Sequence, residues 1–171
     1  MITRKIVLGL AVSLDGFIEG PNGEYDWCFT DQDYGLSEFS NRIDALVMGR
    51  KTFDITKGYD GPNPWSHAKT YVFSRTMKTT PGIEVLSGAM VETMNQLRQQ
   101  PGKDIWLFGG ADLTTQFVNH SLIDEYWLSV HPVLLGAGKP LFHNITNRKN
   151  LTLIESKVYD TGLVSLKYQP T

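Results

Sequence analysis

The chain has 171 residues, of which 41% are hydrophobic and 20% charged, and its formal net charge is −2. This length and composition predict a single domain spanning residues 1–171, and the small negative charge excludes the basic field with which proteins attract nucleic acid. No apolar run approaches the roughly 20 residues of a membrane span. Cys28 is the only cysteine, so an internal disulfide is excluded and a reducing, cytoplasmic location is expected.

The N-terminus combines charged residues with a short apolar run at residues 6–12. A signal peptide is the alternative interpretation, but the run is short, Asp15 interrupts it and no small-residue cleavage site follows. We therefore interpret residues 4–12 as a buried first strand.

Helical patterns then alternate with apolar runs along most of the chain. The sequence predicts helices at residues 33–42, 50–56, 91–100 and 111–119, and strands at residues 45–48, 70–73, 83–86, 104–108 and 124–130. Two final strands, at residues 151–159 and 163–168, are expected to form a hairpin. This alternation predicts an α/β fold with a mainly parallel sheet, helices on both faces and an antiparallel edge.

Ligands of such sheets bind beyond the carboxyl ends of the strands, which here points to the segments after Val12, Met48 and Phe108. The strongest signal is the third, where an apolar strand enters a helix through Gly109 and Gly110. Paired glycines leave the backbone accessible, and the free amides and dipole of the helix attract phosphate. An ordinary tight turn is the alternative. The spacing is not Gly-x-Gly-x-x-Gly, which disfavours an ordinary Rossmann domain.

Two further strand ends carry cations. Residues 49–52 place an arginine and a lysine at a predicted helix start, where an anion between them would offset their unfavourable interaction with the dipole. Ser74 and Arg75 follow the next strand, and a hydroxyl beside a guanidinium can hold a phosphate monoester. Each segment alone is also compatible with a solvated surface. Together they match an adenine dinucleotide with an extra ribose phosphate, which favours NADPH over NADH.

The ordered motifs resemble those of the dihydrofolate reductase superfamily. The resemblance rests on residues 11–18, Trp27, and residues 48–52, 73–75 and 108–110. Residues 122–125 and 131–142 resemble the reductase domain of the bifunctional riboflavin-biosynthesis protein. The resemblance implies a dihydrofolate reductase-like three-layer α/β/α fold with a central mixed sheet. It also implies a cis peptide bond between Gly109 and Gly110, and a homodimer formed through the C-terminal strands.

The same resemblance implies how NADPH would be held. The Ala11 backbone would bind the nicotinamide carboxamide, and Ile18 would pack against the nicotinamide ring. Arg50, Lys51, Ser74 and Arg75 would surround the 2′-phosphate and adenine. Thr52 and the amides of Gly110, Ala111, Asp112 and Leu113 would bind the diphosphate. The turn glycines Gly49 and Gly109 are further predicted cofactor-binding residues.

The acid–base group is harder to place. Dihydrofolate reductases carry one buried carboxylate in the helix after the tryptophan loop, and Asp31 and Asp33 flank the corresponding position. We expect Asp33 to cap the helix and Asp31 to be the catalytic or substrate-anchoring group, with Asp26 as a further candidate.

The predicted substrate contacts are Trp27, Phe53 and Ser129. Phe29 and Trp65 are further candidates for walling a flat heterocycle, although most aromatic side chains belong to the core. Residues 54–65 lack a recognisable form of the acidic, proline-containing substrate motif of the riboflavin reductase. The four histidines show no ligand spacing, so no metal is expected.

The predicted function is NADPH-dependent hydride transfer to a C=N or C=O bond of a small pteridine- or pyrimidine-like metabolite. One alternative is 5-amino-6-(5-phosphoribosylamino)uracil reductase of riboflavin biosynthesis. The other is an NADPH-binding module without turnover. Residues 13–27, which contain three glycines, are a predicted lid.

Overall fold

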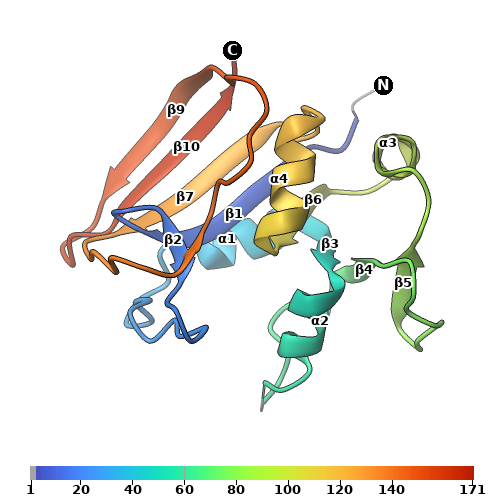
Figure 1. The fold of residues 1–171 in the computed structure, drawn as a ribbon, viewed down its shortest axis with the longest axis horizontal. Helices are drawn as coiled ribbons and strands as arrows, with labels where there is room; N and C mark the ends of the chain where they lie inside the picture. The colour runs from blue at the N-terminus through green and yellow to red at the C-terminus, as the bar shows by residue number, and fades with distance from the viewer. Residues whose placement is uncertain (1–2, 60) are drawn as a thin grey trace.

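The computed structural model describes residues 3–59 and 61–171 (Figure 1). The strands are β1 (Ile6–Ser13), β2 (Phe17–Glu19), β3 (Ile43–Gly49), β4 (Lys69–Phe73), β5 (Ile83–Leu86), β6 (Asp104–Gly109), β7 (Glu125–His131), β8 (Lys139–Pro140), β9 (Leu151–Val158) and β10 (Val164–Pro170). The helices are α1 (Leu36–Arg42), α2 (Arg50–Thr56), α3 (Met90–Gln99) and α4 (Ala111–Asn119).

Most of these strands form one mixed sheet. In the described residues it has eight strands in the order β5-β4-β3-β6-β1-β7-β10-β9. The strands from β5 to β7 are paired in parallel, whereas β10 is antiparallel to both β7 and β9. Figure 1 shows the C-terminal hairpin at one edge of the sheet and β5 at the other. The expectation of a mainly parallel sheet with a closing antiparallel hairpin is confirmed.

Two apolar layers bury the two faces of the sheet. Because side chains alternate across a strand, Leu8 of β1 joins a cluster with α3 and α4, whereas Val7 joins one with α1 and α2. Phe117 of α4 is fully buried in the first cluster, and Phe39 of α1 is buried in the second. Helices therefore cover both faces, as the three-layer prediction requires.

Asp33 fixes the start of α1. Its carboxylate accepts hydrogen bonds from the backbone amide (2.9 Å) and hydroxyl (2.6 Å) of Ser37. These bonds, above all that of the hydroxyl, lower the pKa of Asp33. The N-cap residue itself is Gly35, so Asp33 binds the first turn of α1 from two residues before the cap position that was predicted for it.

The observed element boundaries differ from the prediction mainly at α1, which begins at Leu36 instead of residue 33, and at β3. Ile43, expected on the apolar side of the preceding helix, has extended dihedrals and begins β3. The two short strands β2 and β8 were not predicted. Within the described part of the chain they pair only with each other, at Phe17–Pro140 and Glu19–Lys139, and they are too short to show a hydrophobic period.

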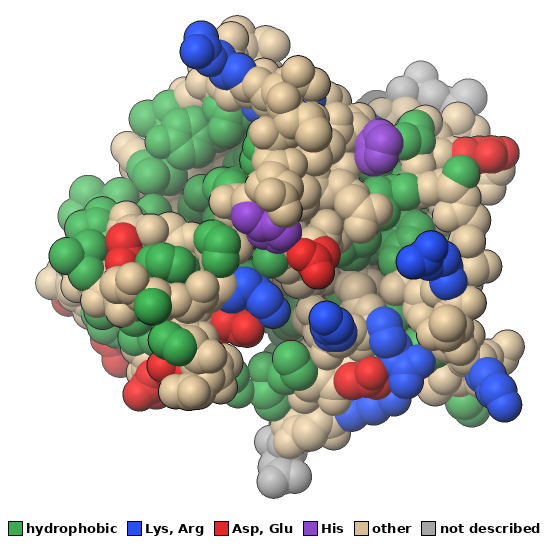
Figure 2. Space-filling model, in the orientation of Figure 1, with side chains coloured by type: hydrophobic (Ala, Val, Ile, Leu, Met, Phe, Trp, Pro, Cys, Tyr) green, Lys and Arg blue, Asp and Glu red, His purple; other side chains and the backbone are tan. Residues whose placement is uncertain are grey.

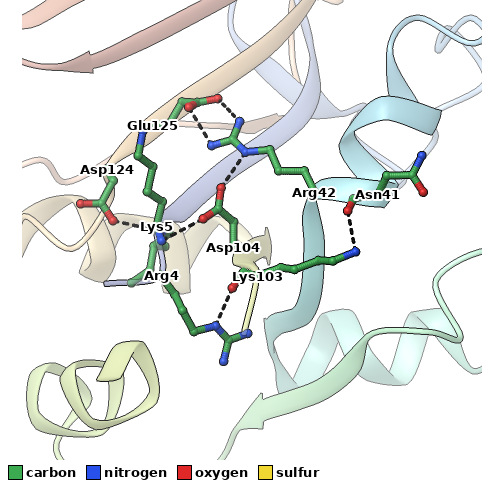
Figure 3. A network of polar contacts seen from close by, with 9 residues as sticks. Arg4, Lys5, Asn41, Arg42, Lys103, Asp104, Asp124 and Glu125 are labelled. Carbon is green, nitrogen blue, oxygen red and sulfur yellow. Dashed lines mark hydrogen bonds and ion pairs between the residues drawn. The ribbon is translucent and has the colours of Figure 1, made fainter. Parts of the chain in front are cut away.

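A polar network covers the amino-terminal ends of the central parallel strands (Figure 3). Arg42 donates two hydrogen bonds to the carboxylate of Glu125, at 2.7 and 2.9 Å, and a third to Asp104, at 2.6 Å. On the same side, Arg98 pairs with Asp124 at 2.9 Å. These contacts secure the end of the sheet opposite to the one where ligands of α/β proteins bind.

Within residues 3–59 and 61–171, no helix combines the length and apolar character that a membrane crossing requires.

Candidate functional site

A cavity of about 560 Å³, here called the cationic cavity, opens beyond the carboxyl ends of β3, β4 and β6. It is lined by residues from three strand-to-helix or strand-to-loop turns and from the turn before α3. These include Gly49, Arg50, Lys51, Thr52, Ser74, Arg75, Gly88, Gly110, Ala111, Asp112, Leu113 and Lys139. Figure 2 shows Lys and Arg side chains gathered on the lower part of this face, over the region where Figure 1 places α2.

The two glycine turns lie against each other. A Cβ atom added to Gly110 would lie 3.0 Å from the hydroxyl of Thr52, so α2 and α4 begin side by side. The Gly109–Gly110 peptide bond is cis, as the resemblance predicts. No heavy atom lies within 4 Å of a Cβ atom placed on Gly109, so the backbone is open there, beside the amino-terminal end of the nine-residue helix α4.

The cations of the cationic cavity are mostly exposed at its rim. Arg50 donates a hydrogen bond to Asp54 at 2.7 Å, and this contact is the main cause of the lowered pKa of Asp54. Arg75 is exposed. The Ser74 hydroxyl accepts hydrogen bonds from the amides of Met77 (3.0 Å) and Thr76 (3.3 Å), which leaves its own proton available for donation.

A second cavity of about 510 Å³, here called the aromatic cavity, adjoins the first. The two share Lys51, Thr52, Gly110 and Lys139. Ala11 of β1, Ile18 of β2 and Ser129 of β7 also line the aromatic cavity. Its aromatic walls are formed by Tyr25, Phe29, Tyr34, Tyr59, Trp65, Trp106, Phe108 and Trp127.

Internal hydrogen bonds hold three of these aromatic side chains. The indole nitrogen of Trp106 donates to the carbonyl oxygen of Gly9 at 2.8 Å, and that of Trp127 donates to the Ser165 hydroxyl at 2.7 Å. The Tyr34 hydroxyl donates to the carboxylate of Asp31 at 2.6 Å. These three side chains are therefore fixed in the wall, and their polar atoms already have partners within the protein.

His131 lies at the end of β7 and fastens the loop before α1. Its Nε2 accepts a hydrogen bond from the amide of Phe29 at 3.1 Å, and its Nδ1 is 2.9 Å from the Ser129 carbonyl oxygen. Burial lowers the pKa of His131. The contacts fit a neutral ring that carries its proton on Nδ1.

The short β2–β8 pair closes the side of the aromatic cavity. Lys139 of β8 forms an ion pair with Glu19 of β2 at 3.1 Å, and both side chains line this cavity. A Cβ atom at Gly138 would overlap the carbonyl oxygen of Glu19, so the two strands meet where the chain has no side chain. Sequence reasoning missed Lys139, although its place after Gly136-Ala137-Gly138 was a usable signal.

All the residues predicted to bind the cofactor line one of the two cavities. Gly109, Ala11 and Ile18 line the aromatic cavity, and the other predicted cofactor residues line the cationic cavity. The three segments expected at one edge of the sheet are therefore brought together.

Of the predicted catalytic and substrate-binding residues, only some line the aromatic cavity. Ser129 lines the aromatic cavity, but Asp31 is exposed and is not among its lining residues, and the Tyr34 hydroxyl lowers its pKa. The Trp27 ring packs edge-on against His131, with ring centres 5.3 Å apart, and Trp27 is not among the lining residues of this cavity. Phe53 is buried in the apolar layer beneath α2.

Sequence reasoning also missed Leu36, Trp127 and His131. The last two share with Ser129 one face of β7, since alternate residues of a strand point the same way. That alternation was a usable signal. Leu36, at the start of α1, is the α1 residue that lines the aromatic cavity.

A family model described as "RibD C-terminal domain" matches residues 4–165. The chain is 45% identical to a protein named "Uncharacterized protein YyaP" of Bacillus subtilis, over 96% of this chain and 94% of that protein. It is 27% identical to the riboflavin biosynthesis protein RibD of Corynebacterium ammoniagenes, over 83% of this chain but 47% of that protein.

Two solved structures extend the comparison. A putative riboflavin biosynthesis protein from Shewanella sp. PV-4 superposes with a TM-score of 0.89 at 28% identity, covering 98% of this chain and 99% of that one. Dihydrofolate reductase from Enterococcus faecalis superposes with a TM-score of 0.71 at 18% identity, covering 98% and 96%. The second likeness shows that the fold is dihydrofolate reductase-like.

Proposed function

Because the chain belongs to the RibD C-terminal domain family, we propose that it is an NADPH-dependent reductase of a C=N or C=O bond in a small heterocycle. The family match supports oxidoreductase activity in general and agrees with the resemblance found in the sequence. NADPH and the type of substrate are the proposed steps beyond it.

The observation that carries this proposal is that the two cavities are continuous at a shared set of lining residues, here called the seam. Lys51, Thr52, Gly110 and Lys139 line both, so one elongated ligand can extend from the cationic into the aromatic cavity. A dinucleotide with a 2′-phosphate has this charge distribution, since its adenosine end is anionic and its nicotinamide end is a flat ring. Gly110 approaches Thr52 so closely that an added Cβ atom would lie 3.0 Å from its hydroxyl, so this hydroxyl and the first amides of α4 could bind the same diphosphate.

Different residues of the chain would bind the two ends of the cofactor and exclude water. Arg50, Arg75 and Ser74 would bind the 2′-phosphate, because guanidinium and hydroxyl groups are strong phosphate donors. Ala11 and Ile18 would orient the nicotinamide against the substrate, and the aromatic walls would exclude water. When bound, the cofactor supplies a hydride from the nicotinamide C4. For Asp31 the proposed role is indirect, through its hydrogen bond to Tyr34.

The two alternatives make different demands on the same site. The 27% identity to RibD supports reduction of the ribosylamino-pyrimidine of riboflavin biosynthesis. An NADPH-binding module would use the cationic cavity without turnover. It is kept open because Glu19 is the only carboxylate among the described residues that line the aromatic cavity, and it is paired with Lys139.

We further propose a homodimer and a cytoplasmic location. The exposed apolar side chains Leu153, Ile154 and Val158 on the edge strand β9 support association through the C-terminal strands. Size-exclusion chromatography with light scattering tests the dimer, since a monomer has a mass of 19.2 kDa.

Tryptophan fluorescence tests the central proposal, because Trp65, Trp106 and Trp127 line the aromatic cavity. The purified protein is titrated with NADPH and with NADH. We expect saturable binding of both, and tighter binding of NADPH. Binding of neither nucleotide would refute the reductase proposal. Complementation of a riboflavin auxotroph then separates the riboflavin-pathway reaction from reduction of another heterocycle.

A further inference from the structure

We propose that the aromatic cavity selects an uncharged, planar aromatic substrate and discriminates against one that carries a phosphate. The inference rests on the proposed reductase function and names the substrate class of the same site. It departs from the riboflavin-pathway alternative, whose substrate is a ribose phosphate.

The first argument is what the walls present to a ligand. The indole nitrogens of Trp106 and Trp127 and the hydroxyl of Tyr34 are bonded to protein acceptors. Gly9 lies between the two indoles, and a Cβ atom there would be 3.3 Å from Trp106 and 3.4 Å from Trp127. The two indoles thus approach each other over a floor without a side chain. Such surfaces favour flat rings that stack or pack edge-to-face.

The second argument is the charge state of the titratable groups in the walls. Burial raises the pKa of Cys28 to about 11 and lowers the pKa of His131. A hydrogen bond with Tyr25 is the main cause that raises the pKa of Tyr59 to about 12. At neutral pH, Cys28, His131 and Tyr59 are therefore all uncharged.

The third argument is where the charged groups lie. Among the described lining residues, the permanently charged side chains are Glu19, Lys51 and Lys139. Glu19 and Lys139 neutralise each other at 3.1 Å. Lys51 lies on the seam with the cationic cavity, where the proposed function uses it for the cofactor. A phosphate in the remainder of the cavity would lose hydration without gaining a cationic partner, which is costly.

The fourth argument is that an apolar side chain, Leu36, occupies the α1 position of the cavity wall. Dihydrofolate reductases carry a substrate-binding carboxylate in the helix after the tryptophan loop, but the α1 residue that lines the cavity here is an exposed leucine. The wall offers the Ser129 hydroxyl as a donor to a carbonyl oxygen or ring nitrogen.

The reaction balances without another reactant. A hydride leaves C4 of the reduced nicotinamide and forms a C–H bond with the substrate carbon. The C=O or C=N π bond breaks, and its oxygen or nitrogen takes a proton from water. The nicotinamide is oxidised and the substrate is reduced by two electrons.

The test compares matched pairs of ring compounds with the full-length protein and NADPH. Each pair has a neutral member and a member that carries a phosphate, for example dihydroneopterin and its phosphate, with neutral and phosphorylated ribosylaminopyrimidines beside them. NADPH oxidation gives kcat/KM, and tryptophan quenching of the NADP⁺-loaded protein gives Kd. We expect at least one neutral ring to be preferred by about tenfold over its phosphorylated partner, equivalent to about 1.4 kcal/mol.

A variant with an added cation is expected to reverse the preference for the neutral ring. Leu36→Arg places a cation at the rim of the aromatic cavity and is expected to shift the ratio about tenfold toward the phosphorylated member. Val91→Arg, on the exposed face of α3, is the control and leaves the ratio unchanged.

Two outcomes overturn the inference while the proposed function stands. One is binding of NADPH with equal or better use of the phosphorylated members, and the other is binding of NADPH with no neutral ring bound or reduced. Failure to bind NADPH would refute the proposed function itself, and the inference with it.

Discussion

The backbone amide of Phe29 donates a hydrogen bond to Nε2 of His131, and the nitrogen atoms are 3.1 Å apart although the residues are 102 positions apart in the chain. The bond joins the loop before α1 to the end of β7, and both residues line the aromatic cavity. The Phe29 and His131 rings also pack together, with centres 5.0 Å apart. One side chain thus fixes the wall of the candidate site.

This contact predicts an acid-sensitive fold. Burial lowers the pKa of His131 below its ordinary 6.5, so the unfolded chain binds the proton more readily than the folded one. The stabilising contribution is complete above about pH 6.5 and is lost as the pH falls from there through the folded pKa. Urea unfolding between about pH 7 and 5 measures the loss.

His131→Gln keeps an acceptor and a donor but cannot titrate, so its stability is expected to fall less over this range. His120→Gln, at an exposed histidine, should match the wild type, and a wild-type slope in H131Q would contradict the assignment.

Cofactor selectivity is the second prediction. Arg50→Ala combined with Arg75→Ala is expected to raise the Kd for NADPH by about 10- to 100-fold, because charge-assisted hydrogen bonds contribute about 1.5–3 kcal/mol. The Kd for NADH is expected to change little, since it has no 2′-phosphate. Fluorescence titration measures both constants, with the exposed Arg148→Ala as control. Equal losses for the two nucleotides would remove the 2′-phosphate assignment.

The β2–β8 contact gives the third prediction. Gly138→Ala places a methyl group onto the carbonyl oxygen of Glu19, at a φ of +144°. We expect a loss of about 1–3 kcal/mol in the free energy of unfolding and weaker NADPH binding, because Lys139 is displaced with β8. Gly136→Ala isolates the backbone effect, since φ is +75° there and no heavy atom lies within 4 Å of the added Cβ atom. Its expected loss is about 1 kcal/mol, without a change in binding. Equal losses of stability in the two variants, together with unchanged NADPH binding in Gly138→Ala, would show that the β2–β8 contact does not matter.

Much of the fold was predictable because each central strand is a short apolar run that ends in a turn signal. Residues 50–56 and 111–119 were predicted with the observed helix boundaries, since Gly49 and Gly110 interrupt the pattern just before them. The pairing of β2 with β8 was not predictable, because it depends on the close approach of Gly138 to Glu19 across the folded molecule. Local sequence carries no such information.

The site was predictable to different extents in its two halves. Phosphate-binding turns have local signatures, such as the double glycine before α4, and these residues meet in the cationic cavity. The aromatic cavity depends on which face of each strand an aromatic residue occupies and on which polar atoms are satisfied internally. Phe53 and Trp127 both belong to the same buried apolar layer, yet only Trp127 also lines the aromatic cavity. The expectation for Asp31 came from its distance along the chain from Trp27, and that distance does not show that α1 presents Leu36 to the cavity.

The last prediction concerns the network at the opposite end of the sheet. Arg42 holds the buried carboxylate of Glu125 by two hydrogen bonds and also contacts Asp104. Arg42→Met leaves that carboxylate without its partner, and we expect a loss of about 3–5 kcal/mol in the free energy of unfolding. Glu125→Leu is the second single change, and the double variant should lose clearly less than the sum of the two, because no charge is then left buried and unpaired. Urea unfolding of the wild type, the two single variants and the double variant measures the coupling, and additive losses would contradict it.

The Kd for NADPH is expected to stay unchanged in all these variants, since none of these three side chains lines the cationic or the aromatic cavity. A stability loss with unaltered binding would therefore separate the end of the sheet that secures the strands from the end that carries the candidate site.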